Sequence, residues 1–272
     1  MHEALTYITV CGAAFFVAGL TLVSGFGLGT LLLPAFALFF PLDVAVAATA
    51  VVYLANNVFK LGLVGRHASG QVLVPFVLFA VPAALAGAIL LEHLSARPPL
   101  AEWMLGARAC RITGIGLTLG ALMVAFALIE FLPGFESWSV SPRLLWLGGA
   151  ISGFFGGLSG HQGALRSAFF VRTGMSKEQF VGTSAAAAIC IDAVRLCVYF
   201  STFLAAKLGT LSASGGWPLV AAATLAAFIG SYIGARAIRK ITLRTVKRLV
   251  AALLVFGLAV LQSVILIEGR KP

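Results

Sequence analysis

Long apolar runs alternate with short polar or glycine-rich joints along the whole chain. Because a helix that crosses a bilayer needs about 20 apolar residues, each run bounded by charge, glycine or proline is a candidate span. The segments predicted in this way are 4–24, 27–41, 44–65, 71–91, 111–132, 144–159, 162–173, 179–204, 216–238 and 248–267. Segments 27–41 and 162–173 are short and follow the glycine-rich breaks SGFGLG and SGHQG, so we predict half-helices or re-entrant pieces there.

The same order of five segments occurs twice, which predicts an internal repeat. A shift of 135 residues lays Ser24 and Gly25 on Ser159 and Gly160, Thr49 on Ser184, Asn57 on Asp192, and Lys60 on Arg195. An odd number of crossings per half would invert the second half relative to the first, as in many secondary transporters. We therefore predict an all-α integral membrane protein of two inverted repeats, 1–132 and 144–272, joined by a linker at 133–143. Each half would hold one short or re-entrant segment, beside about eight full transmembrane helices in total.

The composition agrees with a membrane protein and excludes a soluble one. Of the 272 residues, 60% are hydrophobic and 10% charged, with a mean hydropathy of +1.04, whereas soluble domains are about 25% charged. No stretch is polar enough for a soluble domain of useful size, which also excludes a soluble enzyme on a membrane tether. The four cysteines, Cys11, Cys110, Cys190 and Cys197, form no CxxC pair, so we expect no disulfide framework and no metal site. The run SGFGLGT lacks GxGxxG spacing and a Walker lysine, so we expect no nucleotide cofactor, and no other cofactor is expected.

The net charge of +10 arises from basic residues that sit mostly in the joints. The positive-inside rule and contact with anionic lipid explain it better than nucleic-acid binding, so the expected partner is the lipid bilayer and not nucleic acid. One side of the predicted layout carries eleven Lys and Arg: Lys60, Arg66, Arg143, Arg172, Lys177, Arg236, Arg239, Lys240, Arg244, Lys247 and Arg248. The other side carries six: Arg97, Arg108, Arg111, Lys207, Arg270 and Lys271. We take the first side as cytoplasmic, which places both termini outside.

Three charged residues lie deep in predicted spans, where a charge costs about 2.5 to 3.5 kcal/mol on insertion scales. Arg166 follows the second glycine break by one turn, and Asp192 and Arg195 lie near the middle of 179–204, at a spacing of i and i+3 on one helix face. One interpretation of the pair is a structural salt bridge without substrate contact. Two Arg against one Asp still leave a positive surplus, which favours an anionic cargo held by guanidinium donors.

The glycine breaks would add to such a site. A half-helix that begins at membrane depth directs unpaired N–H groups and the positive end of its dipole into the cavity, so we place a candidate substrate site between the two breaks. Its candidate residues are Arg166, Arg195, Asp192, His161, Gln162, Ser167, Ser24, Gly25, Gly29, Gly160, Gly163, Thr49, Asn57 and Ser184, with Thr30 as a further neutral donor. Taken singly, a Ser or Thr in a membrane helix more often bonds its own backbone than a ligand.

Other features have competing explanations. Gly149, Gly153 and Gly157 recur at four-residue intervals, and for this small-xxx-small pattern we favour close helix packing over cavity lining. His161 could accept a proton and couple transport to the proton gradient, or it could be a neutral residue lining the pore. The sequence holds no activated Ser and no second carboxylate at a telling spacing, so we expect no enzymatic activity.

The chain contains four distinctive stretches: SGFGLGTLLLP at 24–34, AATAVVYLANNVFK at 47–60, GFFGGLSGHQG at 153–163 and VGTSAAA at 181–187. In this order they resemble the sulfite exporter TauE/SafE family of bacterial inner-membrane permeases, over roughly 19–91 and 148–240. The resemblance implies an all-helical, multi-pass permease of the bacterial cytoplasmic membrane. Such a permease moves a small sulfur-containing or organic anion, such as sulfite or a sulfonate, generally outward and without ATP or a redox cofactor.

The chain departs from the family pattern at SGHQGALRSAFF, where His161, Gln162 and Arg166 stand and Ala168 takes the place of a proline. This departure favours a specialised anion site over one for sulfite itself. The expected function is a secondary exporter of a small anion, with a passive anion channel or a structural membrane protein as alternatives. A cation or metal transporter would need several acidic residues or a cluster of metal ligands near the middle of the membrane, and Asp192 alone, beside Arg195, does not provide them. A homo-oligomer stays open, because small-residue faces serve contacts within and between subunits alike.

Overall fold

The computed structural model describes residues 2–24, 29–105, 108–131, 140–201 and 216–237. The helices are α1 (His2–Ser24), α2 (Gly29–Ala37), α3 (Leu42–Val64), α4 (Gly70–Ser95), α5 (Gly114–Phe131), α6 (Leu145–Ser159), α7 (Gly163–Phe170), α8 (Lys177–Tyr199) and α10 (Gly216–Ala237). Short 3-10 turns, η1 (Gly65–His67), η3 (Pro142–Leu144) and η4 (Val171–Thr173), lie between them. The predicted helix 248–267 and most of the linker 133–143 lie outside the described residues.

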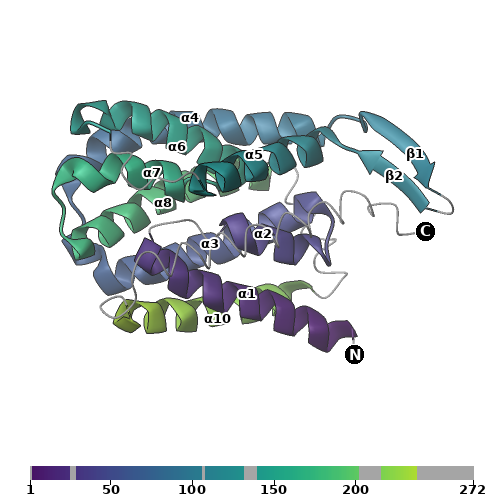
Figure 1. The fold of residues 1–272 in the computed structure, drawn as a ribbon, viewed down its shortest axis with the longest axis horizontal. Coiled ribbons are helices and arrows are strands. Elements are labelled where there is room, and N and C mark those ends of the chain that lie inside the picture. Colours follow the sequence, from purple (N-terminus) through teal and green to yellow (C-terminus); the bar gives the residue numbers. More distant parts are fainter. Residues whose placement is uncertain (1, 25–28, 106–107, 132–139, 202–215, 238–272) are drawn as a thin grey trace.

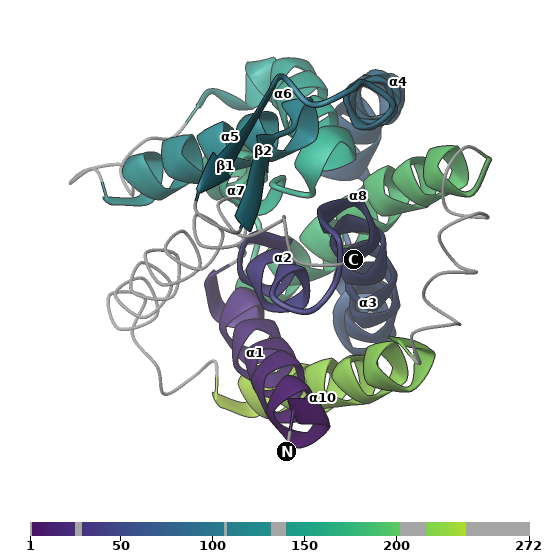
Figure 2. The ribbon, with the colours of Figure 1, turned by 90° about the vertical axis from the view of Figure 1, so that its right-hand side faces the viewer.

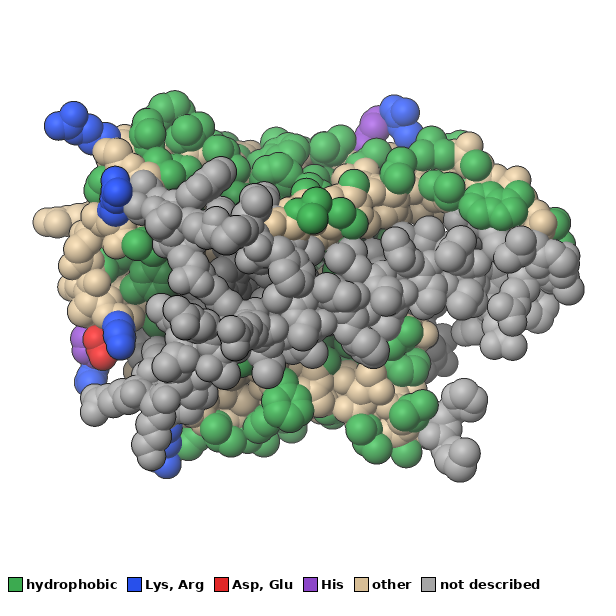
Figure 3. Space-filling model, in the orientation of Figure 1, with side chains coloured by type: hydrophobic (Ala, Val, Ile, Leu, Met, Phe, Trp, Pro, Cys, Tyr) green, Lys and Arg blue, Asp and Glu red, His purple; other side chains and the backbone are tan. Residues whose placement is uncertain are grey.

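Within the described residues, five helices are long and apolar enough to cross a bilayer. Their apolar windows are Ala4–Thr21, Val44–Leu63, Gly70–Ser95, Lys177–Tyr199 and Gly216–Arg236, while α5 offers the shorter window Gly114–Phe126. The two segments predicted to be short are short, since α2 and α7 span only 9 and 8 residues. Where Figure 3 shows described residues, hydrophobic side chains gather along the upper and lower parts of the bundle, and charged side chains lie mainly toward its ends. This distribution is expected for a bundle whose sides face lipid.

Glycines bring two pairs of parallel helices into backbone contact. On α6, Gly149, Gly153 and Gly157 face the carbonyl groups of residues 76, 80 and 84 of α4, and the two sets of numbers rise together. On α10, Gly230 and Gly234 face the carbonyls of Phe15 and Gly19 of α1 in the same parallel sense. A Cβ at any of these glycines would collide with the opposing backbone, so the helices approach as closely as they do because a side chain is missing. The packing role predicted for the α6 glycines is confirmed.

Helices α3 and α8 cross in the middle of the bundle and run antiparallel. The side chain of Asn57 contacts Asp192, and the backbone N–H of Ser69, beyond the end of α3, donates to Thr183 Oγ1 at 2.9 Å. Residue numbers therefore increase along α3 in the direction in which they decrease along α8. Figures 1 and 2 both show α3 and α8 between a layer of α1 and α10 and a layer of α4, α5 and α6. The polar middle of α3 and α8 therefore lies inside the bundle.

A β-hairpin takes up the second half of the predicted joint between segments 71–91 and 111–132, while α4 extends into its first half, to Ser95. Strands β1 (Ala101–Leu105) and β2 (Arg108–Ile112) pair antiparallel, with Trp103 opposite Cys110, and they project beyond the end of α4 (Figure 1). Pro98 and Pro99 follow α4 and cannot continue a helix. Helix α5 consequently begins at Gly114, three residues later than predicted, and the hairpin is a local exception to the all-α prediction.

Candidate functional site

The break between α6 and α7 is built on a glycine with a left-handed backbone. Gly160 ends α6 at φ +82°, and its N–H donates to the carbonyl of Gly156, after which α7 begins at Gly163. A Cβ on Gly160 would lie 2.5 Å from Arg195 Nη1, so glycine is needed both for the backbone conformation and for the close approach of Arg195. The break between α6 and α7 therefore lies directly against Arg195 of α8.

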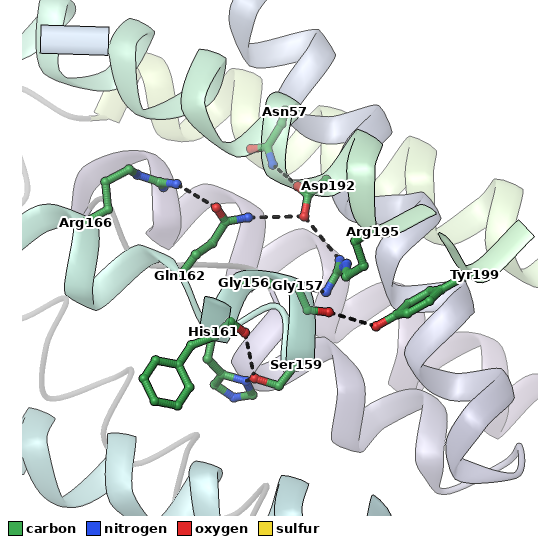
Figure 4. Close-up of polar contacts among 11 residues, drawn as sticks. Asn57, Gly156, Gly157, Ser159, His161, Gln162, Arg166, Asp192, Arg195 and Tyr199 are labelled. Carbon is green, nitrogen blue, oxygen red and sulfur yellow. Dashed lines mark hydrogen bonds and ion pairs between the residues drawn. The ribbon is translucent and has the colours of Figure 1, made fainter. Parts of the chain in front are cut away.

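Asp192 is the hub of a polar network inside the bundle (Figure 4). Its Oδ1 accepts a hydrogen bond from Gln162 Nε2 at 3.1 Å and forms a salt bridge with Arg195 Nη2 at 3.2 Å. Its Oδ2 accepts from Asn57 Nδ2 at 3.1 Å. The carboxylate is fully buried. The sequence-based expectation that Asp192 and Arg195 share one face of the helix agrees with this salt bridge, and the network also joins α3 and the α6–α7 break to α8.

Arg166 reaches this network through an intermediary. Its Nη1 donates to Gln162 Oε1 at 3.2 Å, and the amide of the same Gln162 donates to Asp192. Arg166 is 4% exposed, and among the described residues its Nε has no hydrogen-bond partner. A buried guanidinium held by one neutral oxygen, with a donor left over, is arranged to meet a further acceptor.

Lys60 is a buried charge that the sequence analysis assigned to a cytoplasmic joint. That assignment was wrong, because α3 continues to Val64 and Lys60 lies within it at 6% exposure. Lys60 Nζ donates to Thr21 Oγ1 of α1 at 2.8 Å. The sequence contains one indication of this burial, because the 135-residue shift aligns Lys60 with Arg195, which lies deep in a predicted span. Without Lys60, the predicted cytoplasmic side keeps ten of its eleven basic residues.

The cluster is positive as a whole. Lys60, Arg166 and Arg195 are buried, and among the described residues Asp192 is the buried carboxylate that opposes them. Only Arg195 forms a salt bridge with it within the described part of the chain. With all four groups ionised, a surplus of two positive charges lies at the centre of the bundle.

Two predicted hydroxyl residues flank the cluster without hydrogen bonds in the described part of the chain. Thr49 Oγ1 and Ser184 Oγ are buried, and neither has a partner among the described residues. They precede Asn57 and Asp192 by eight residues each, or about 12 Å of helix, on antiparallel helices. They consequently lie on opposite sides of the Asn57–Asp192 contact.

Some of the remaining predicted site residues lie apart from the Asp192 network. Ser167 Oγ donates to the carbonyl of Gly163 at 2.8 Å, a bond to its own helix. His161 points away from Asp192 in Figure 4: its Nδ1 pairs with Ser159 Oγ at 3.0 Å, and its ring stacks on Phe126. Among the described residues its Nε2 has no partner. Gly29 begins α2. Gly25 and the side chains of Ser24 and Thr30 lie outside the described part of the chain.

The comparisons with known proteins identify the family. The family described as sulfite exporter TauE/SafE matches residues 10–261, which is nearly the whole chain. Neither a comparison with curated proteins nor one with solved structures returned a significant match. The described residues hold no group of three or more His, Cys, Asp or Glu side chains that could bind a metal ion. The apolar helices and the match over both halves together identify a multi-pass membrane protein that belongs to the sulfite exporter TauE/SafE family, a family of permeases for sulfur-containing anions.

Proposed function

We propose that the protein is a permease for a small oxyanion, which binds at the cluster of Lys60, Arg166, Arg195 and Asp192. The observation that carries the proposal is Arg166, a buried guanidinium whose hydrogen bond goes to the neutral Gln162. Asp192 attracts Arg166 but forms no salt bridge with it in the described part of the chain. A buried charge without a direct ionic partner is costly, and an anionic substrate would supply that partner. The family supports the same class of cargo.

Arg166 is the residue that we assign to direct contact with the anion. The planar guanidinium offers parallel N–H donors that match two oxygens of a sulfonate or carboxylate. Gln162 orients Arg166 by accepting from its Nη1, and Asp192 in turn holds Gln162 and Arg195. Arg195 is the second candidate for anion contact, because its Nε has no partner among the described residues.

The helix arrangement supports two inverted repeats, 1–132 and 144–272, with 133–143 as the linker and about eight full transmembrane helices. Under the 135-residue shift, α1 corresponds to α6 and α3 to α8. The parallel pair of α1 and α10 then has its counterpart in the parallel pair of α6 and α4. Lys60 bonds Thr21, and Arg195 bonds the carbonyl of Gly156 at 3.4 Å, so both partners also differ by 135 residues. Alternating access around a central site follows from this symmetry.

Secondary export across a bacterial cytoplasmic membrane is the mode that we propose, with the end that carries Arg66, Arg143, Arg172 and Lys177 on the cytoplasmic side. The positive-inside rule supports this orientation, and it places both termini outside. His161 is the candidate proton acceptor for coupling. A passive anion channel is the alternative, and it would conduct without dependence on a proton gradient.

A binding experiment tests the proposal. Purified protein in nanodiscs is heated with sulfite, thiosulfate, sulfoacetate, taurine, acetate or chloride, and its unfolding temperature is followed. A ligand at about 100 times its Kd should stabilise the protein by roughly 2.7 kcal/mol. The proposal predicts a shift with at least one oxyanion in the wild type, no shift in Arg166→Ala, and a retained shift in Arg172→Ala, an exposed arginine that follows α7. A shift of the same size in Arg166→Ala would remove Arg166 from the site.

A further inference from the structure

Lys60 is the least neutralised of the buried charges. Its Nζ has three N–H donors, and the acceptor that the structure provides is the hydroxyl of Thr21. That hydroxyl donates its own proton to the carbonyl of Ala18 at 3.0 Å, so it offers Lys60 a neutral oxygen and nothing more. Among the described residues no carboxylate lies within salt-bridge distance of Lys60. Lys60 Nζ is thus buried with N–H donors that this bond does not use.

The proposed repeat accounts for the lack of a counter-ion for Lys60 among the described residues. Arg195 is neutralised by Asp192, which lies three residues earlier on the same face of α8. The equivalent position three residues before Lys60 is Asn57, whose amide is neutral. Two equivalent cations therefore flank the contact of Asn57 with Asp192, and in the described part of the chain only Arg195 has a carboxylate of its own.

Lys60 and Arg166 share one electrostatic environment. Lys60 lies about one helical turn after Asn57, which donates to Asp192. Arg166 donates to Gln162, which donates to the same carboxylate. Both cations therefore lie beside the Asp192 network. Since Arg195 is already paired with Asp192, the surplus of positive charge belongs to Lys60 and Arg166. A ligand with one negative charge would cancel half of it, and a ligand with two would cancel all of it.

We propose that Lys60 is a specificity-determining residue of the anion site and that Lys60 and Arg166 together select doubly charged anions over singly charged ones. This inference rests on the proposed function and deepens it, because it names the charge class of the cargo. Lys60 favours the second negative charge, while the guanidinium of Arg166 binds the oxygens of either class of anion.

Two sulfonates of similar size and different charge provide the test. Sulfoacetate carries a sulfonate and a carboxylate, whereas isethionate carries a sulfonate and a neutral hydroxyl. Titration calorimetry at neutral pH on full-length protein in nanodiscs gives the ratio of the two Kd values. We expect the wild type to prefer sulfoacetate and Lys60→Gln to reduce this preference by about tenfold, with isethionate affinity retained. Arg66→Gln, an exposed cation six residues further along the chain, is the control and should keep the wild-type ratio.

A second variant leaves Lys60 in place. Asn57→Asp would give Lys60 the carboxylate that Arg195 already has, so it should reduce the preference for sulfoacetate in the same direction. The inference is overturned if Lys60→Gln keeps the wild-type ratio, or if it weakens both ligands equally, which would indicate a structural role. Failure of both ligands to bind the wild type would overturn the proposed function itself, and this inference with it.

Discussion

Asn57 donates a hydrogen bond from its side-chain amide to Asp192 Oδ2 at 3.1 Å, and the two residues are 135 positions apart. That separation equals the shift that aligns the two halves of the sequence. Two equivalent residues of a twofold arrangement touch each other only where they meet at its axis. In the proposed repeat, the axis therefore passes between α3 and α8 at this contact, and the buried cations lie around it.

Exchanging the two groups tests this relationship. Asn57→Asp replaces an N–H donor with a second carboxylate facing Asp192, so we expect a loss of about 1–3 kcal/mol in the free energy of unfolding. The double variant Asn57→Asp with Asp192→Asn restores one donor and one acceptor across the same contact, and it gives Lys60 a carboxylate three residues away. We expect it to be more stable than the sum of the single variants predicts, by about 0.5–3 kcal/mol. Unfolding in detergent measures all four proteins, and strictly additive effects would contradict a direct contact.

Gly160 should tolerate no side chain. In Gly160→Ala a left-handed backbone costs about 1–2 kcal/mol, and the added Cβ displaces the guanidinium of Arg195. Gly174→Ala is a matched control, since Gly174 is also left-handed, at φ +73°, while no described atom lies within 4 Å of an added Cβ. We expect both variants to lose stability and only Gly160→Ala to lose anion-induced thermal stabilisation. Equal anion responses in the two variants would separate Gly160 from the site.

The α4–α6 interface should be sensitive to a single methyl group. In Gly153→Ala the new Cβ meets the backbone of Ala80, so the helices must separate and the protein should lose about 1–3 kcal/mol. Gly62→Ala on α3 adds the same group where no described atom lies within 4 Å, and helix propensity should make it neutral or stabilising by up to about 1 kcal/mol. Thermal unfolding compares the two. A Gly153→Ala variant as stable as Gly62→Ala would contradict the close packing.

Sequence pattern predicted most of the described helices, because apolar length and glycine breaks are local signals. The predicted segments 44–65 and 144–159 correspond to α3 at Leu42–Val64 and α6 at Leu145–Ser159. The hairpin was missed because apolar run length was the main criterion. Pattern also identified Arg166 and the Asp192–Arg195 pair, since deep charges stand out in apolar runs.

Tertiary contacts decided the rest. Lys60 lies within the predicted segment 44–65, so its sequence position is compatible with a membrane joint or with the interior of the bundle. Its burial and its contact with Thr21 of α1 decide between the two, and they depend on tertiary packing. The role of Gln162 as the link between Arg166 and Asp192 depends on side-chain geometry that spacing does not encode. His161 lies beside Gln162 in the sequence, yet it turns toward Ser159 and Phe126. Adjacent residues in a glycine break can point in opposite directions, and the sequence does not show in which direction each side chain points.

Anion flux through reconstituted protein tests the central claim most directly. Wild-type, Arg166→Lys and Arg172→Lys proteins are placed in proteoliposomes, and uptake of sulfur-labelled sulfite, thiosulfate and sulfoacetate is followed. Lysine keeps the charge of Arg166 and loses its planar pair of donors. The account predicts saturable flux of at least one of these anions in the wild type and in Arg172→Lys. It predicts flux lower by about tenfold or more in Arg166→Lys, with unchanged insertion and thermal stability. Wild-type flux in Arg166→Lys, or no anion flux in the wild type, would contradict it.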